Sequence, residues 1–136
     1  MPAVSLLAVL LLTSCATQRR IDRDDLNSDL TRGISLASEA SLYLQYSAEL
    51  RTSQSFSEGH LHYLADEANR IEKELQQAIS APEDTHTLNE ARFQFQALSQ
   101  QLVLMQQSSS DANAPLHSIR ELDEIGKAMQ QAKSSR

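Results

Sequence analysis

The sequence predicts an all-α protein, an antiparallel up-down bundle of three to four helices. Its 136 residues include only three Gly, three Pro and no Trp, which is too little turn chemistry for a many-stranded sandwich or barrel. Leu, Ala, Gln, Ser and Glu outnumber the β-branched and aromatic residues, and this favours helix over strand. From residue 26 onward, apolar residues recur at intervals of three and four, as they do on a helix that buries one face.

The first fourteen residues stand apart because none of them carries a charged side chain. Residues 4–12 form a nine-residue stretch that is apolar except for Ser5. A helix rises about 1.5 Å per residue, so this stretch is too short to cross a hydrocarbon core of roughly 30 Å. Its length is typical of the apolar region of a signal peptide. We therefore expect residues 1–14 to be a removable leader.

The leader ends in Leu12, Thr13 and Ser14, followed by Cys15. This quartet resembles the lipobox of bacterial lipoproteins, in which Leu, a small or β-branched residue and a small residue precede a cysteine. The resemblance implies that the lipoprotein signal peptidase recognises the first three residues and cuts before Cys15. The cysteine sulfur would then carry a diacylglycerol, and its amine a further acyl chain. The resemblance covers about the first 15 residues and implies nothing about the helical body.

The resemblance also implies a location. Acyl chains contribute about 0.8 kcal/mol per buried methylene, so two or three of them anchor a protein stably. The residue after the cysteine is Ala16, whereas Asp at this place retains lipoproteins in the inner membrane in enterobacteria-like sorting. We therefore expect a lipid-anchored envelope protein, at the periplasmic leaflet of the outer membrane. Residues 15–25 would be its tether, in which three Arg and three Asp balance one another.

The helical body, residues 26–133, divides into four segments. The first helix is expected at 25–52, where two apolar rows run side by side, as suits a helix that touches two neighbours. Helices with a single apolar stripe are expected at 57–79, 86–107 and 114–133. The three single stripes are Leu61, Leu64, Ala68, Ile71, Leu75 and Ala78; Leu88, Ala91, Phe95, Leu98, Leu102 and Met105; and Leu122, Ile125, Met129 and Ala132.

Short polar connections between the segments place consecutive helices antiparallel. The connection at residues 80–86 offers two alternative capping boxes, Ser80 with Glu83 and Thr87 with Glu90, either of which could mark a helix start. Two other architectures stay open, because an apolar stripe does not say whose helix it faces. One is a three-helix body with a loosely docked last helix, and the other is a coiled-coil oligomer of open hairpins.

Composition and motifs argue against several classes of function. A net charge of −6 and a pI near 5.1 have the wrong sign for binding nucleic acid. The single cysteine, Cys15, excludes an intramolecular disulfide and a four-cysteine zinc site. No Gly-x-Ser-x-Gly and no Gly-rich phosphate loop occurs, although hydrolases and nucleotide-binding enzymes use these motifs. We therefore expect neither an enzyme nor a bound cofactor.

The histidines offer only a weak metal site. An antiparallel bundle would gather Glu58, His60, His62 and His117 at one end and leave His86 at the other. On a helix His60 and His62 point about 200° apart, so they do not share a face. No histidine lies in an apolar stripe, where haem ligation would need one. We expect no metal here, and a metal or haem carrier is an alternative function only.

Some apolar residues exceed what narrow stripes require. They either complete the core or form a docking face for a second copy or another envelope protein. These residues are Leu36, Ala40, Tyr43 and Leu50 on the first helix and Phe93 and Leu104 on the third. The expectation is a non-catalytic interaction or scaffold lipoprotein, and an inhibitor or exclusion-type lipoprotein is the remaining alternative.

Overall fold

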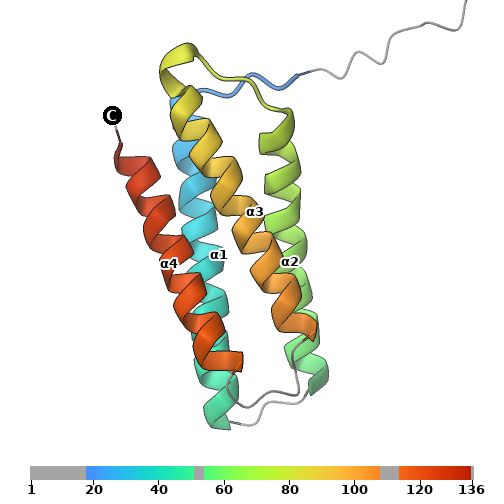
Figure 1. The fold of residues 1–136 in the computed structure, drawn as a ribbon. Coiled ribbons are helices and arrows are strands. Elements are labelled where there is room, and N and C mark those ends of the chain that lie inside the picture. Colours follow the sequence, from blue (N-terminus) through green and yellow to red (C-terminus); the bar gives the residue numbers. More distant parts are fainter. Residues whose placement is uncertain (1–17, 51–53, 108–113, 136) are drawn as a thin grey trace, which may run out of the picture.

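The computed structural model describes residues 18–50, 54–107 and 114–135, with side chains for 18–47, 58–107 and 116–135. The described residues form four long helices, α1 (Arg23–Leu50), α2 (Gln54–Gln77), α3 (Thr85–Gln107) and α4 (Ala114–Ser134), and the short 3-10 helix η1 (Pro82–Asp84). Consecutive long helices run antiparallel (Figure 1). The predicted all-α, up-down bundle is confirmed, with every long helix ending within three residues of its expected bounds.

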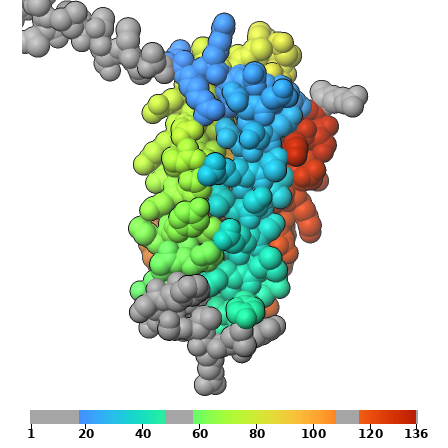
Figure 2. Space-filling model, turned by 180° about the vertical axis from the view of Figure 1, so that it is seen from behind, coloured from blue at the N-terminus to red at the C-terminus, as the bar shows by residue number. Residues whose placement is uncertain are grey.

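The four helices pack unequally. α1 makes its most extensive contact with α4, and α2 makes its own with α3, while α3 also packs against α4. α1 and α2 lie side by side on the face seen in Figure 2 but approach each other less closely. Because α4 is the main neighbour of α1, the three-helix body with a loosely docked last helix is wrong. The α1–α2 hairpin also packs against the α3–α4 hairpin of the same chain, unlike the open hairpins of a coiled-coil oligomer.

The core consists of the predicted stripes. Every residue of the three single stripes is buried, and both Phe95 and Met129 are fully enclosed. In α1, Leu30 and Ala37 from one apolar row and Leu36 from the other are buried as well. Fully burying a side chain such as Leu contributes about 1.5–3 kcal/mol. The wide apolar face of α1 therefore serves the bundle's own core.

Gly33 lies where α1 comes closest to its neighbours. A Cβ at this position would be 2.6 Å from Met129 Sδ and 2.8 Å from Phe95 Cζ. Ordinary contacts between such atoms are about 3.5–4.0 Å long. Glycine thus lets the backbone of α1 pack directly on side chains from α4 and α3.

Neither predicted capping box marks a helix start in the α2–α3 connection. η1 begins after Ala81, which makes no side-chain cap hydrogen bond, and α3 begins at Thr85. Thr87 lies inside the first turn of α3 and is only 3% exposed. Its hydroxyl accepts a hydrogen bond of 2.8 Å from Arg23 Nη1. The residue is thus used to bind α1 rather than to cap its own helix.

Arg92 of α3 closes the end of α2 instead. Its Nε donates to the carbonyl oxygen of Leu75 at 2.9 Å and its Nη2 to that of Ala78 at 2.6 Å. The last carbonyls of a helix have no partner within the helix, and a cation near them is favoured by the helix dipole. One guanidinium therefore caps α2 and joins it to α3.

Candidate interaction surface

The predicted lipidation and cleavage residues, Leu12, Thr13, Ser14 and Cys15, lie outside the described residues. The described chain begins at Gln18, and the residues that follow it are hydrogen-bonded to the bundle. The N–H of Ile79 donates to the carbonyl of Arg19, and the N–H of Ile21 donates to the carbonyl of Ile79, both at 2.9 Å. Ile21 is buried at 3% exposure. Residues 19–21 thus form a strap across the end of the bundle where α2 ends and α3 begins (Figure 1).

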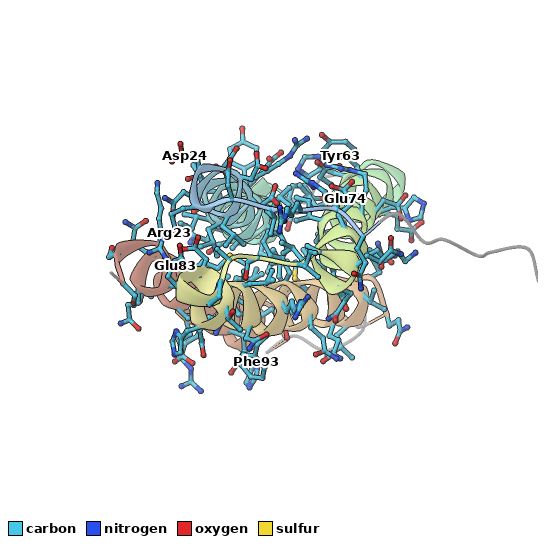
Figure 3. The ribbon with its side chains drawn as sticks, turned by 90° about the horizontal axis from the view of Figure 1, so that it is seen from above. Arg23, Asp24, Tyr63, Glu74, Glu83 and Phe93 are labelled. Carbon is cyan, nitrogen blue, oxygen red and sulfur yellow. The ribbon has the colours of Figure 1, made fainter. Side chains whose placement is uncertain are left out.

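Side chains at the start of α1 contact η1, α3 and the end of the chain after α4. Figure 3 shows this end of the bundle from above. Asp22 Oδ1 accepts a hydrogen bond of 2.8 Å from the N–H of Asp25, as an N-cap residue does. Arg23 Nη1 contacts Asp84 Oδ1 at 3.1 Å in addition to Thr87, and its Nη2 donates to the carbonyl of Ser135. The N-terminal segment, η1 and the end of α4 are therefore held together.

A chain of ion pairs runs along the seam between α1 and α2. Arg19 Nη1 lies 2.9 Å from Glu74 Oε2, and Arg70 pairs with both Glu74 and Glu67. Arg32 of α1 also pairs with Glu67, whose side chain is only 13% exposed. Hydrogen bonds from Arg70, with the charges of Arg70 and Arg32, hold the pKa of Glu67 below its ordinary value. The network joins two helices whose apolar contact is limited.

Asp29 lies near this network but, unlike the paired carboxylates, has an oxygen without a hydrogen-bond partner and a raised pKa. Its Oδ2 is buried and has no hydrogen-bond partner. Burial raises the pKa of Asp29 above its ordinary value, although the charge of Arg19 acts in the opposite direction. Ionising a half-buried carboxylate that has one unsatisfied oxygen costs free energy. Asp29 therefore weakens the α1–α2 seam that its neighbours hold together.

Of the two alternatives for the α1 residues, completion of the core is the one that the structure shows for Leu36 and Ala40. Leu36 and Ala40 are only 6% and 0% exposed, and they complete the core of the same chain. Tyr43 is half-buried against the core, with its ring centroid 5.0 Å from that of His60 on α2. The reason is the width of the apolar face of α1, which meets neighbours on both sides. The side chain of Leu50 lies outside the described ones.

The two α3 members of that set do lie on the surface. Phe93 is 65% exposed and Leu104 is 56% exposed. Figure 3 shows Phe93 pointing away from the bundle, on the side opposite Tyr63. Ala97, between them, is partly buried against the core. The exposed apolar surface that the sequence indicated is therefore confined to the outer face of α3.

The weak metal candidates do not converge. Each of the three histidines lies beside its own carboxylate: His60 Nε2 is 3.3 Å from Glu39, His62 Nε2 is 3.4 Å from Asp66, and His117 Nε2 is 3.7 Å from Glu121. Glu58 lines a shallow depression with Gly59, His62 and Gln106. Across the described residues, no group of three or more His, Cys, Asp or Glu side chains could hold a metal ion. A helix directs His60 and His62 to different faces, and this separates their partners.

Sequence reasoning missed the strap, Arg23 and Arg92. The signal for the strap was available, because Ile21 is an isolated apolar residue among charged neighbours. The two arginines gave no such signal, since each acts on groups that are distant in sequence or on backbone carbonyls.

Comparison with protein-family models, curated proteins and solved structures gives no match. Among the helices described, none is both long enough and apolar enough to span a bilayer.

Proposed function

We propose that the chain is a bacterial lipoprotein that is lipidated on Cys15 and acts as a non-catalytic interaction module facing the periplasm. The observation that carries this proposal is the order of its first 15 residues: an apolar stretch at 4–12, then Leu12, Thr13, Ser14 and Cys15. Ala16 after the cysteine favours the outer membrane. The proposal requires cleavage before Cys15 and a thioether between its sulfur and a diacylglycerol.

The strap supports this arrangement. Only three residues lie between Cys15 and Arg19, and a fully extended chain covers at most about 3.6 Å per residue. The bundle would therefore be held within about 14 Å of the lipidated residue. Because Arg19 and Ile21 are hydrogen-bonded to Ile79 and Ile21 is buried, a force on the anchor would act directly on the folded domain. A protein that presents a bundle at a defined height above a membrane needs such an attachment.

The use of the charged side chains supports a binding role over catalysis. Arg23 and Arg92 join segments of the bundle or cap a helix, and Arg70 pairs with Glu67 and Glu74 of its own helix. The histidines described above lie beside separate carboxylates. What remains for recognition is the surface, and three of its exposed large apolar side chains, Phe93, Val103 and Leu104, lie on α3.

Lipidation is tested by metabolic labelling with a palmitate analogue in a bacterium that processes lipoproteins. The wild-type chain should be labelled, should sediment with membranes and should band with the outer membrane on a density gradient. Cys15→Ala should lose the label and leave the membrane fraction. Ser14→Ala is the matched control, because it keeps a small residue before the cysteine and should be labelled normally. If Cys15→Ala stays labelled and membrane-bound, the lipoprotein proposal is wrong.

A further inference from the structure

The outer face of α3 has an unusual composition. Three of the eight large apolar side chains that are exposed among the described residues are on this helix, namely Phe93, Val103 and Leu104. Four residues follow one another along the helix at intervals of four, three and four: Phe93, Ala97, Gln100 and Leu104. Phe93, Gln100 and Leu104 are exposed, and Ala97 between them is half-buried. Residues with this spacing share one face of a helix. We call these four residues the α3 stripe.

The α3 stripe lies in a stretch without charge. Residues 93–107 contain no Asp, Glu, Lys, Arg or His, although 30 of the 136 residues of the chain are Asp, Glu, Lys or Arg and the net charge is −6. Depletion of charge beside exposed aromatic and aliphatic residues is typical of the centre of a protein interface. Two copies of an acidic chain repel each other over most of their surfaces. They can meet without like-charge contacts through this face.

The spacing of the stripe is also self-complementary. The intervals read the same in both directions, about a midpoint between Leu98 and Ser99. When two copies of α3 pack antiparallel about that midpoint, Phe93 of each faces Leu104 of the other, and Ala97 faces Gln100. A two-fold dimer requires such matching of one patch with itself.

The residues beside the stripe favour the antiparallel direction. Antiparallel packing sets Glu90 opposite Gln107 of the second copy, whereas parallel packing would set Glu90 against Glu90. It also sets Gln96 opposite Gln101, and an amide can both donate to and accept from another amide. The small side chain of Ala97 lets two helices approach closely near the axis.

We propose that the chain pairs with a second copy of itself through the α3 stripe, with the two α3 helices antiparallel. This deepens the proposed function by naming the partner of the binding module, and it does not require the lipid anchor. One helix face per copy is smaller than the roughly 800 Å² that each partner buries in a standard interface, so we expect the pairing to be weak in solution. Confinement to a membrane would raise the effective concentration of the copies.

Cysteine cross-linking of the full chain in cells tests the proposal. Phe93→Cys and Leu104→Cys are made in separate copies with different tags and expressed together, and the membranes are oxidised. In an antiparallel pair, positions 93 and 104 of different copies are opposite, within the reach of a disulfide. Like positions are about 16 Å apart along the helix axis. We expect a mixed disulfide between the two tagged copies and few like-with-like products.

The controls separate the outcomes. The wild-type chain, with Cys15 alone, should give no cross-link, and neither should Tyr63→Cys, which is 58% exposed on the opposite side from Phe93. The pair Ala97→Cys and Gln100→Cys repeats the test closer to the axis. A predominance of like-with-like disulfides overturns the antiparallel arrangement. Absence of both mixed products in folded protein, or a disulfide to another envelope protein instead, overturns self-pairing. Palmitate labelling of the same samples reports separately on the anchor.

Discussion

The close packing at Gly33 makes a quantitative prediction about stability. Replacing this residue with Ala puts a Cβ 2.6 Å from Met129 Sδ, 2.8 Å from Met129 Cε and 2.8 Å from Phe95 Cζ. Both neighbours are fully buried, so they can move only by disturbing the core. Overpacking of this kind costs about 1–3 kcal/mol. Ala gains about 0.5–1 kcal/mol over Gly through its helix propensity. The expected net loss for Gly33→Ala is the difference, about 0–2.5 kcal/mol in the free energy of unfolding.

Gly59 provides the matched control, because it also lies inside a helix but a Cβ there would meet nothing within 4 Å. Gly59→Ala should therefore stabilise the protein by about 0.5–1 kcal/mol. Urea unfolding followed by circular dichroism at 222 nm measures both variants. Met129→Ala should relieve part of the Gly33→Ala clash, so the double variant should lose less than the sum of the two single losses. If Gly33→Ala is as stable as Gly59→Ala, α1 does not approach α4 and α3 as described.

Three further predictions concern polar groups. Arg92→Ala removes the cap from the last carbonyls of α2 and should lower the free energy of unfolding by about 1–3 kcal/mol. Amide hydrogen exchange at that end of α2 should become faster. Arg120 is exposed and lies 4.0 Å from Glu124, so the control Arg120→Ala should change stability little. Glu67 has a lowered pKa, so its contribution is present above the unfolded pKa and is lost as the pH falls through the folded one. Glu67→Gln should therefore lower the urea midpoint at pH 7, with a difference that shrinks in acid. Asp29 has a raised pKa, so stability falls as the pH rises from the unfolded pKa through the folded one. Asp29→Asn should raise the midpoint at pH 7 and should leave it unchanged in strong acid. Urea titrations at pH 3 and pH 7 check both carboxylates, and a shift of the same sign for the two would contradict the electrostatics of the seam.

The helices and their buried faces could be predicted from the sequence because both depend on local spacing. The stripe from Leu88 to Met105 fixes one face of α3 whatever the helix packs against. Spacing does not say which helix covers which face. Leu36 and Ala40 therefore looked like surplus apolar residues, although they fill a core shared with neighbouring helices.

The hydrogen bonds and the ion pair made by Arg23 could not be predicted, because they join groups that are far apart in sequence. Arg23 contacts Thr87, 64 positions later, and no local pattern records such a pairing. The candidate binding surface was found in part, since Phe93 and Leu104 lie outside the buried stripe of α3. Leu36 and Ala40 belong to the core instead, because α1 has two apolar rows.

We propose above all that Cys15 carries lipid and holds the bundle at a membrane. Mass spectrometry of the N-terminal peptide, from the chain purified out of bacterial membranes, tests it most directly. We expect a mature chain that starts at Cys15, with no residues of 1–14 and with a diacylglycerol thioether on the cysteine. A chain that retains residues 1–14, or one whose Cys15 is an unmodified thiol, would contradict it.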